Sequence, residues 1–186
     1  MSAEPGDPEL RDDQLVSRAR AGDSGALDRL VARHHAVAYR LALGYTRDPD
    51  LAADATQNAF LKALAALDRF RGDARFRTWL LSIVMNESRT LMRRAGRRRE
   101  SSLDDVAPIR EPAIPVDEAV VRRQEEGRAR ELVGRLPEKQ RLAVTLRVDE
   151  GLSFREVGEL IGSSEGAARV NYHHGIRKLR EWMDDA

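Results

Sequence analysis

The side chains best suited to chemistry in this sequence are arginines, and they gather in two places. Arg169 and Arg177, near the C-terminus, stand among small residues and histidines. The other gathering, near the middle of the chain, comprises Arg89, Arg93, Arg94, Arg97, Arg98 and Arg99. Guanidinium groups bind phosphate oxygens, and each phosphate contact steepens the salt dependence of nucleic-acid binding by about one unit. The arrangement favours a nucleic-acid surface, although a basic run of this kind is also common on a merely solvated helix face.

Constellations for catalysis or metal binding are not found, so we predict neither an enzyme nor a bound cofactor or metal. The sequence has no cysteine, which excludes thiol catalysis and cysteine-ligated zinc. The histidines form adjacent pairs, His34-His35 and His173-His174. Neighbouring side chains on a helix point about 100° apart, so such pairs chelate poorly. There is also no nucleophile-base-acid set and no glycine loop that would cradle a phosphate.

Charge and hydropathy predict a protein that does not enter a membrane. The formal net charge is only +1, so any nucleic-acid role depends on how the charge is distributed. The first residues, Met1 to Asp13, are acidic and contain proline, unlike a signal peptide. The longest apolar run, Trp79 to Met85, is far too short to span a bilayer. We therefore expect a cytoplasmic protein.

Apolar residues recur every three to four positions along most of the chain, which predicts an all-α fold. Pro49 suits the first turn of a helix, and Ser153 with Glu156 forms a capping box. We expect a loop at 68–73. The expected helices lie at about 12–22, 27–45, 49–67, 75–94, 119–135, 137–149 and 153–161, followed by a final helix that ends near Met183.

A change of composition divides the chain into two small helical domains joined by a proline-containing acidic linker. Pro108, Pro112 and Pro115 forbid a continuous helix, and positions 100–118 carry a net charge of −5. A linker of this charge repels DNA, and its composition alone is typical of a plain tether. The predicted units are a flexible N-terminus at 1–11, a first domain at 12–95, the linker at 96–118 and a second domain at 119–186.

The last two predicted helices have the form of a helix-turn-helix, in which a short capped helix, a tight turn at Gly162-Ser163 and a longer helix follow one another. On a wheel of the longer helix, the residues that should pack inward are Ala168, Tyr172, Gly175, Ile176, Leu179 and Met183. The opposite face is small at its beginning, which lets it approach a DNA groove closely, and basic further along. Val170 faces outward and is suited to touch a thymine methyl group. An ordinary amphipathic helix with a solvated basic face is the plain alternative. The residues that we predict to bind DNA here are Ser164, Glu165, Ala167, Arg169, Val170, Asn171, His173, His174 and Arg177.

The segments LPEKQR at 136–141, EGLSFRE at 150–156 and SEGAAR at 164–169 resemble region 4 of the extracytoplasmic-function (ECF) sigma factors of bacterial RNA polymerase. In that family, this domain reads the minus-thirty-five promoter element and rests on the flap of the polymerase β subunit. The sequence departs from the family pattern at Asn171, where a basic residue is usual, and at Tyr172, where leucine is usual. These departures bear on which bases are read.

The pattern Asp54-Ala-Thr-Gln57-Asn-Ala-Phe60 resembles region 2.2 of the same family. There the aspartate and the glutamine lie one turn apart and dock on the clamp helices of the polymerase β′ subunit. The resemblance implies polymerase binding by Asp54, Gln57, Asn58 and Leu61, with Asn58 standing where glutamate is common. Without the resemblance, the same polar face would be more typical of a solvated helix.

The segment Phe70-Arg-Gly-Asp-Ala-Arg-Phe76, with Thr78-Trp-Leu80 and Asn86 after it, resembles regions 2.3 and 2.4 of the family. The resemblance implies that the loop captures a base flipped from the non-template strand of the minus-ten element. Extracting a base costs about a few kcal/mol, which stacking and edge hydrogen bonds must supply. Trp79 is predicted to pack in the core rather than on a base. The residues implied in minus-ten binding are Phe70, Arg71, Gly72, Asp73, Arg77, Asn86, Arg89, Arg93 and Arg94.

The resemblance covers about residues 12–95 and 119–183 and implies an ECF-type sigma factor. Such a factor binds core RNA polymerase, directs promoter recognition and DNA melting, and starts transcription, usually under the control of an anti-sigma factor. In these factors the linker threads the positively lined RNA path of the polymerase. The alternative is a helix-turn-helix regulator that acts without binding the polymerase core. A third possibility, a pure interaction module, leaves the arginine cluster without a purpose.

Overall fold

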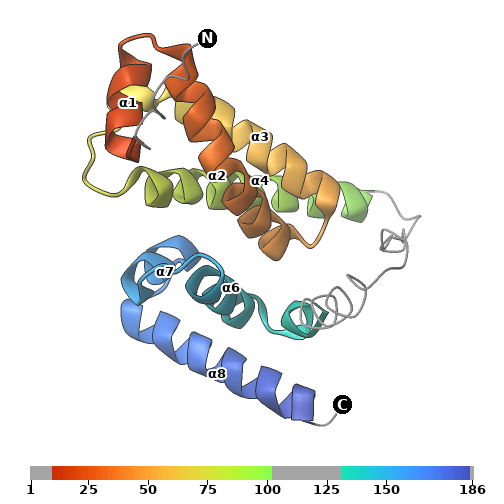
Figure 1. Cartoon of the computed structure of the whole chain (residues 1–186). Helices are drawn as coiled ribbons and strands as arrows, with labels where there is room; N and C mark the ends of the chain where they lie inside the picture. The colour runs from red at the N-terminus through yellow and green to blue at the C-terminus, as the bar shows by residue number, and fades with distance from the viewer. Residues whose placement is uncertain (1–9, 102–130, 185–186) are drawn as a thin grey trace, which may run out of the picture.

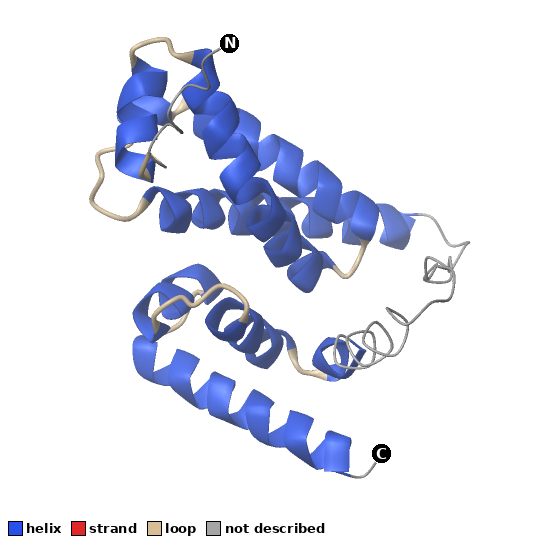
Figure 2. Ribbon diagram, in the orientation of Figure 1, coloured by secondary structure: helices blue, strands red, loops and turns tan. Residues whose placement is uncertain are grey.

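The computed structural model describes residues 10–101 and 131–184, and in these two stretches every regular element is a helix (Figure 2). The elements are α1 (Asp12–Arg20), α2 (Ser24–Thr46), α3 (Pro49–Ala65), the short 3₁₀ helix η1 (Leu67–Arg69), α4 (Phe76–Ser101), α6 (Glu138–Val148), α7 (Phe154–Ile161) and α8 (Glu165–Asp184). The predicted all-α fold with two helical domains is confirmed. Positions 1–9 of the predicted N-terminus (1–11) and positions 102–118 of the predicted linker (96–118) lie outside the described residues.

The first domain is a bundle of α2, α3 and α4, with α1 packed against α2 (Figure 1). Asp48 caps α3 by accepting hydrogen bonds from the backbone nitrogens of Asp50 (2.9 Å) and Leu51 (3.1 Å), and Pro49 occupies the first turn. The inward face of α3 is made of small residues, which let its backbone come close to α2 and α4. Its buried members are Ala52, Ala55, Thr56, Ala59, Phe60 and Ala63.

Helix α4 runs through Ser101, past residue 95, where we placed the end of the first domain. Gly96 does not end it, because a glycine in a helix interior costs only about 1 kcal/mol and the arginines around it favour the helix. The first proline after this point is Pro108. The boundary between the first domain and the linker therefore stays a prediction.

The second domain packs α8 across α6 and α7 (Figure 1). Ser153 caps α7 as predicted, because its hydroxyl accepts from the backbone nitrogen of Glu156 while the Glu156 carboxylate accepts from the backbone nitrogen of Ser153. Gly162 ends α7 in the left-handed conformation, with φ +64°, and makes the tight turn into α8. Gly175 allows α8 to cross α6 closely, since a Cβ there would lie 2.7 Å from Val144 Cγ2.

The inward face of α8 differs from the helical-wheel prediction at the C-terminal end of the helix. Ala168 and Gly175 are buried, and Tyr172 packs against the core. Met183, which we expected to pack inward, is 62% exposed and that expectation is wrong. The difference arises because α6 is an eleven-residue helix, whereas α8 has twenty residues, so α8 extends beyond its support.

The two domains pack on each other in the described structure. Helix α6 lies against α2 and α7 lies against α4, so that the second domain sits along one side of the bundle (Figure 1). Buried residues of both domains, such as Leu80 and Val157, belong to one hydrophobic cluster. The described part of the chain contains no helix with the length and apolarity needed to cross a membrane.

Candidate nucleic-acid interface

The outward face of α3 carries the side chains predicted to dock on another protein. Asp54 and Gln57 lie one turn apart and are exposed, and Asn58 beside them is half-buried. Leu61, one further turn along, is 60% exposed. The structure therefore brings the four predicted residues onto one accessible face, opposite the small residues that pack against the bundle.

The loop between η1 and α4 presents its polar side chains to solvent. Arg71, Gly72 and Asp73 are exposed, and Gly72 adopts a positive φ of +80° that a residue with a Cβ rarely adopts. Arg71 Nε pairs with Asp73 Oδ2 at 3.1 Å across this glycine. Both side chains are largely exposed, so the pair contributes little to stability and is free to exchange for another partner.

An aromatic cluster lies beneath the loop. The Phe70 ring contacts Trp79, with 4.9 Å between ring centroids, and meets Phe76 edge-on at 5.9 Å. Trp79 is partly buried and packs against the core, which confirms the core position predicted for it. Phe70 is itself half-buried, so at rest it supports the loop rather than standing free in solvent.

The basic residues of α4 follow the helix away from the loop. Asn86, Arg93 and Arg94 are exposed, and Arg89 is half-buried. Arg93 Nε donates to the backbone oxygen of Arg89 at 3.3 Å, so Arg93 lies along the helix. A shallow groove of about 510 Å³ at this end of α4 is lined by Thr90, Arg93, Arg94 and Arg97.

The outward face of α8 is accessible over most of its length. Val170 is 54% exposed even though it is apolar, as expected for a residue with no role in packing. Ala167 and Asn171 are half-buried. The exposed members of the predicted set are Ser164, Glu165, Arg169, Val170, His173, His174 and Arg177.

Several of these side chains already have partners on their own helix. Ser164 caps α8, because its hydroxyl accepts from the backbone nitrogen of Ala167 at 3.1 Å. Asn171 Nδ2 donates to the backbone oxygen of Ala167 at 2.8 Å. Arg169 pairs with Glu165 at 3.1 Å, both about half exposed. Exposed pairs of this kind contribute at most about 1 kcal/mol, so DNA can displace them.

Two residues predicted for the minus-ten element bond to the second domain instead. The buried carboxylate of Glu150, at the turn between α6 and α7, accepts from Arg40 of α2 through Nε (2.9 Å) and Nη2 (2.7 Å). Its other oxygen accepts from Arg77 of α4. Arg89 Nη2 donates to the backbone oxygen of Leu160 at 2.9 Å.

Further hydrogen bonds join the two domains along the same seam. Arg141, which is buried in α6, donates from Nε to the backbone oxygen of Gly44 at 2.6 Å. Arg47, at the end of α2, donates to the backbone oxygens of Gly134 and Leu136. The contact therefore combines ion pairs on the buried Glu150 carboxylate with several hydrogen bonds to backbone carbonyls.

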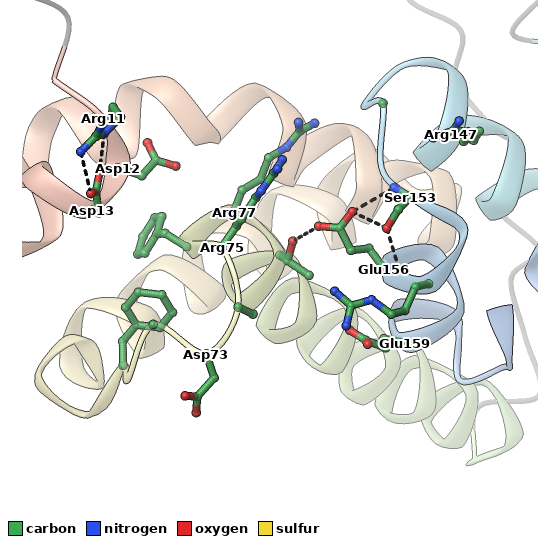
Figure 3. Close-up of a pocket in the computed structure, with 17 residues that line it drawn as sticks. Arg11, Asp12, Asp13, Asp73, Arg75, Arg77, Arg147, Ser153, Glu156 and Glu159 are labelled. Carbon is green, nitrogen blue, oxygen red and sulfur yellow. Dashed lines mark hydrogen bonds and ion pairs between the residues drawn. The ribbon is translucent and has the colours of Figure 1, made fainter.

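A cavity of about 1040 Å³ opens between the loop and α7 (Figure 3). Arg75 and Arg77 lie side by side on one wall, and Glu156 faces them from α7. Thr78 Oγ1 donates to Glu156 Oε1 at 2.8 Å. Burial raises the pKa of Glu156, but hydrogen bonds from Ser153 and Thr78, with the charge of Arg75, outweigh it and hold that pKa below the ordinary value of a glutamate.

The residues that join the domains were missed by the sequence reasoning. Glu150, Arg40 and Arg141 come from segments far apart in the chain, and the Arg40–Glu150 contact spans 110 positions. The burial of Glu150 and Arg141 leaves no periodic trace, because a charged residue on a helix ordinarily predicts solvent. Among the described residues, no three side chains suited to metal binding gather in one place.

Two family models match most of the chain. Sigma-70 region 2 matches residues 30–98, which include α3, the loop and most of α4. Sigma-70 region 4 matches residues 126–179, which include the helix-turn-helix. The *Escherichia coli* ECF RNA polymerase sigma-E factor is 34% identical over 95% of this chain and 94% of its own length. The chain belongs to the ECF sigma factors.

Other relatives agree with this assignment. The RNA polymerase sigma-H factor of *Pseudomonas aeruginosa* is 32% identical over 95% of this sigma factor and 93% of its own length. The structure of CnrH in complex with the cytosolic domain of CnrY has a TM-score of 0.67 and 26% identity, and covers 94% of this chain and 97% of CnrH. The sigma factor RpoE of *Bartonella quintana*, at 21% identity and a TM-score of 0.66 over 84% of this chain and 96% of its own, has the same fold.

Membership of the family establishes what the protein does. It is a transcription initiation factor, not an enzyme, and its regions 2 and 4 bind core RNA polymerase and promoter DNA. The alternative of a helix-turn-helix regulator that acts without polymerase is not favoured, because a match to sigma region 2 stands in the same chain as the helix-turn-helix.

Proposed function

We propose that three separate surfaces of this sigma factor divide the work of promoter recognition. The outward face of α3, with Asp54, Gln57, Asn58 and Leu61, docks on the clamp helices of the β′ subunit. The exposure of Leu61 beside Asp54 and Gln57 supports this assignment, since Leu61 is the large apolar side chain of α3 that is left exposed.

The minus-ten element binds the loop and the basic side of α4. Arg71, Gly72 and Asp73 are exposed above the aromatic cluster. A flipped base has a ring of that cluster to stack on, and the exposed Arg71–Asp73 pair offers it polar groups. The strand then follows α4, whose residues Asn86, Arg89, Arg93 and Arg94 contact phosphates. Arg77 joins them once Glu150 no longer holds it.

The minus-thirty-five element binds α8 in the major groove. The beginning of the helix is small, and its exposed face turns basic toward Arg177, so bases and phosphates both find suitable partners. Val170 contacts a thymine methyl group. Asn171, at a position where a basic residue is usual in the family, is suited to an adenine edge or a phosphate.

Regulation of this sigma factor falls to an anti-sigma protein that masks these surfaces. CnrH, a similar protein, was solved in complex with the cytosolic domain of CnrY. A protein that works on RNA polymerase works in the cytoplasm, which is where we place this one. The predicted domain boundaries, with the linker passing through the RNA path of the polymerase, are part of the same proposal.

The first experiment tests the α3 surface, because polymerase binding separates a sigma factor from other DNA-binding proteins. The purified chain is mixed with sigma-free bacterial core RNA polymerase, and wild type is compared with Asp54→Ala/Gln57→Ala. The double variant should lose most of the complex while keeping its fold by circular dichroism. Asp28→Ala, which removes one exposed charge from α2, is the control and should bind as wild type does. Equal binding by all three would show that α3 is not the docking face.

A further inference from the structure

Helix α1 lies outside the residues matched by the family models, yet it contacts the loop proposed to capture a base. Arg20, its last residue, donates to the backbone oxygen of Leu67 through Nε (3.0 Å) and Nη2 (2.8 Å). The same Nη2 reaches the backbone oxygen of Phe70, the residue that opens the loop. One guanidinium therefore ties α1 to η1 and to the first residue of the loop.

The other end of α1 is tied to the residue that closes the loop. Asp12 pairs with Arg33 (2.8 Å) and with the buried His34 (2.8 Å) of α2. The hydrogen bond with His34 is the main reason that the pKa of Asp12 lies below its ordinary value. The His34 ring packs on Phe76, the first residue of α4, with 5.4 Å between centroids.

Both ends of the loop are thus fixed through one helix, whereas residues 71–75 between them are all exposed. Between its two tied ends, α1 buries Leu15 and Val16 in the core, so its position is set by the body of the domain. A loop held at both ends by a packed helix has few conformations to lose when a ligand binds it.

We infer that α1 is a positioning element for base capture and that Arg20 is its principal positioning residue. Arg20 does not touch the base. It holds the backbone at Leu67 and Phe70 so that Arg71 and Asp73 are presented in one geometry, and Asp12 does the same through His34 and Phe76. This inference rests on the proposed role of the loop in minus-ten binding.

The test uses the holoenzyme, formed from the full chain and core polymerase. A single-stranded minus-ten oligonucleotide that carries 2-aminopurine reports both affinity and base capture. Arg20→Gln should bind the oligonucleotide about three- to tenfold more weakly, because the ordering of the loop is then completed only on binding. The fluorescence change that accompanies capture should fall, while affinity for core polymerase stays unchanged.

Two matched variants separate geometry from charge. Arg20→Lys keeps the charge but loses the fork that reaches two carbonyls, so it should recover only part of the binding. Arg18→Gln removes the same charge from an exposed position of the same helix and should bind as wild type does. Full recovery by Arg20→Lys, or an equal loss in Arg18→Gln, would reduce Arg20 to a source of positive charge and overturn the inference.

Variants of the loop distinguish the positioning role of Arg20 from the proposed role of the loop in minus-ten binding. If Arg71→Ala/Asp73→Ala binds the oligonucleotide normally, the loop does not capture a base and the proposed function of the loop fails. If that variant loses binding while Arg20→Gln does not, only the positioning role fails. A large fall in melting temperature for Arg20→Gln, with loss of polymerase binding, would assign Arg20 to the stability of the domain and also overturn the inference.

Discussion

The two surfaces that we assign to promoter DNA differ in whether the protein itself occupies them. On α4, Arg77 and Arg89 are bonded to the helix-turn-helix domain. Along α8, by contrast, Val170, His173 and His174 face solvent. An arginine whose Nη2 donates to Glu150 or to a carbonyl of α7 has fewer donors left for a phosphate and is held on the side of the second domain. The closed arrangement therefore leaves the minus-thirty-five surface available and withholds part of the minus-ten surface.

The covering contact is built so that it can be released. The Glu150 side chain is only 4% exposed, but its partner Arg40 is 49% exposed and is open to competition from water and salt. Arg77 Nε is buried and has no hydrogen-bond partner among the described residues, so the pairing of Arg77 is incomplete. Arg77 is therefore the incompletely satisfied partner of Glu150, and the exposed Arg40 is the partner that a competing ligand displaces most easily.

We expect the largest loss of stability and of DNA binding when the fold of the second domain, which contacts Arg77 and Arg89, is disrupted. A Cβ at Gly158 would lie 2.9 Å from the backbone oxygen of Ser163, so Gly158→Val forces the turn of the helix-turn-helix to shift. We expect the second domain to lose about 3 kcal/mol of stability. Chemical denaturation followed by circular dichroism measures this loss.

The same variant should lose affinity for duplex minus-thirty-five DNA while keeping the part of its affinity for core polymerase that α3 provides. Gly134→Val, at a glycine where a Cβ meets nothing within 4 Å, is the control. Retention of minus-thirty-five binding by Gly158→Val would contradict the assignment of this turn.

Neutralising Glu150 should have a smaller effect than Gly158→Val, because it weakens the contact between the two domains without unfolding either of them. Glu150→Gln removes the charge that pairs with Arg40 and Arg77, at a cost to the closed arrangement of about 1–2 kcal/mol after allowance for the exposure of Arg40. The free chain should then bind single-stranded minus-ten DNA about tenfold more tightly. Small-angle X-ray scattering should show a larger radius of gyration.

Glu159→Gln, on the exposed side of α7, is the control. It should leave the affinity for single-stranded minus-ten DNA and the radius of gyration unchanged. A Glu150→Gln chain that binds the minus-ten strand no better than wild type would show that the domain contact does not limit access.

Acid should produce a smaller effect at the same seam. The pKa of Glu156 is lowered in the folded protein, so its contribution to stability is full above the pKa of the unfolded chain and is lost as the pH falls through the folded pKa. Glu156→Gln keeps the capping hydrogen bonds but does not titrate. Its melting temperature should therefore fall less steeply than that of wild type below the ordinary glutamate pKa. Parallel curves for the two proteins would show that Glu156 is not the group responsible.

We expect the smallest effect from removing single arginines, which changes the salt dependence of DNA binding at each of the two surfaces. Arg177→Ala should lower the slope of log affinity against log salt for minus-thirty-five DNA by about one unit. Arg89→Ala should change the corresponding slope for minus-ten DNA in the holoenzyme but not in the free chain, where Leu160 occupies the guanidinium. Equal changes in both states would mean that Arg89 is accessible before the polymerase binds.

The helices of this protein could be predicted from the sequence, because the interactions that begin them are local. Asp48-Pro49 and the Ser153-Glu156 box begin their helices through bonds within three residues. Periodicity also predicted most of the inward face of α8, where Ala168 and Gly175 are buried. The resemblance to sigma regions 2 and 4 was carried by short motifs and is confirmed by the family models.

The contacts by which these helices hold one another in place could be seen only in the tertiary structure. Glu150 reaches Arg40 across 110 positions, and Arg20 reaches Phe70 across 50. Met183 is exposed because α8 is longer than α6 and extends beyond it. A helical wheel shows which face a residue lies on but not where the neighbouring helix ends. Such contacts depend on how the helices pack, and packing is set by the whole core. A charged side chain looks the same in the sequence whether it ends in solvent or at the seam between two domains.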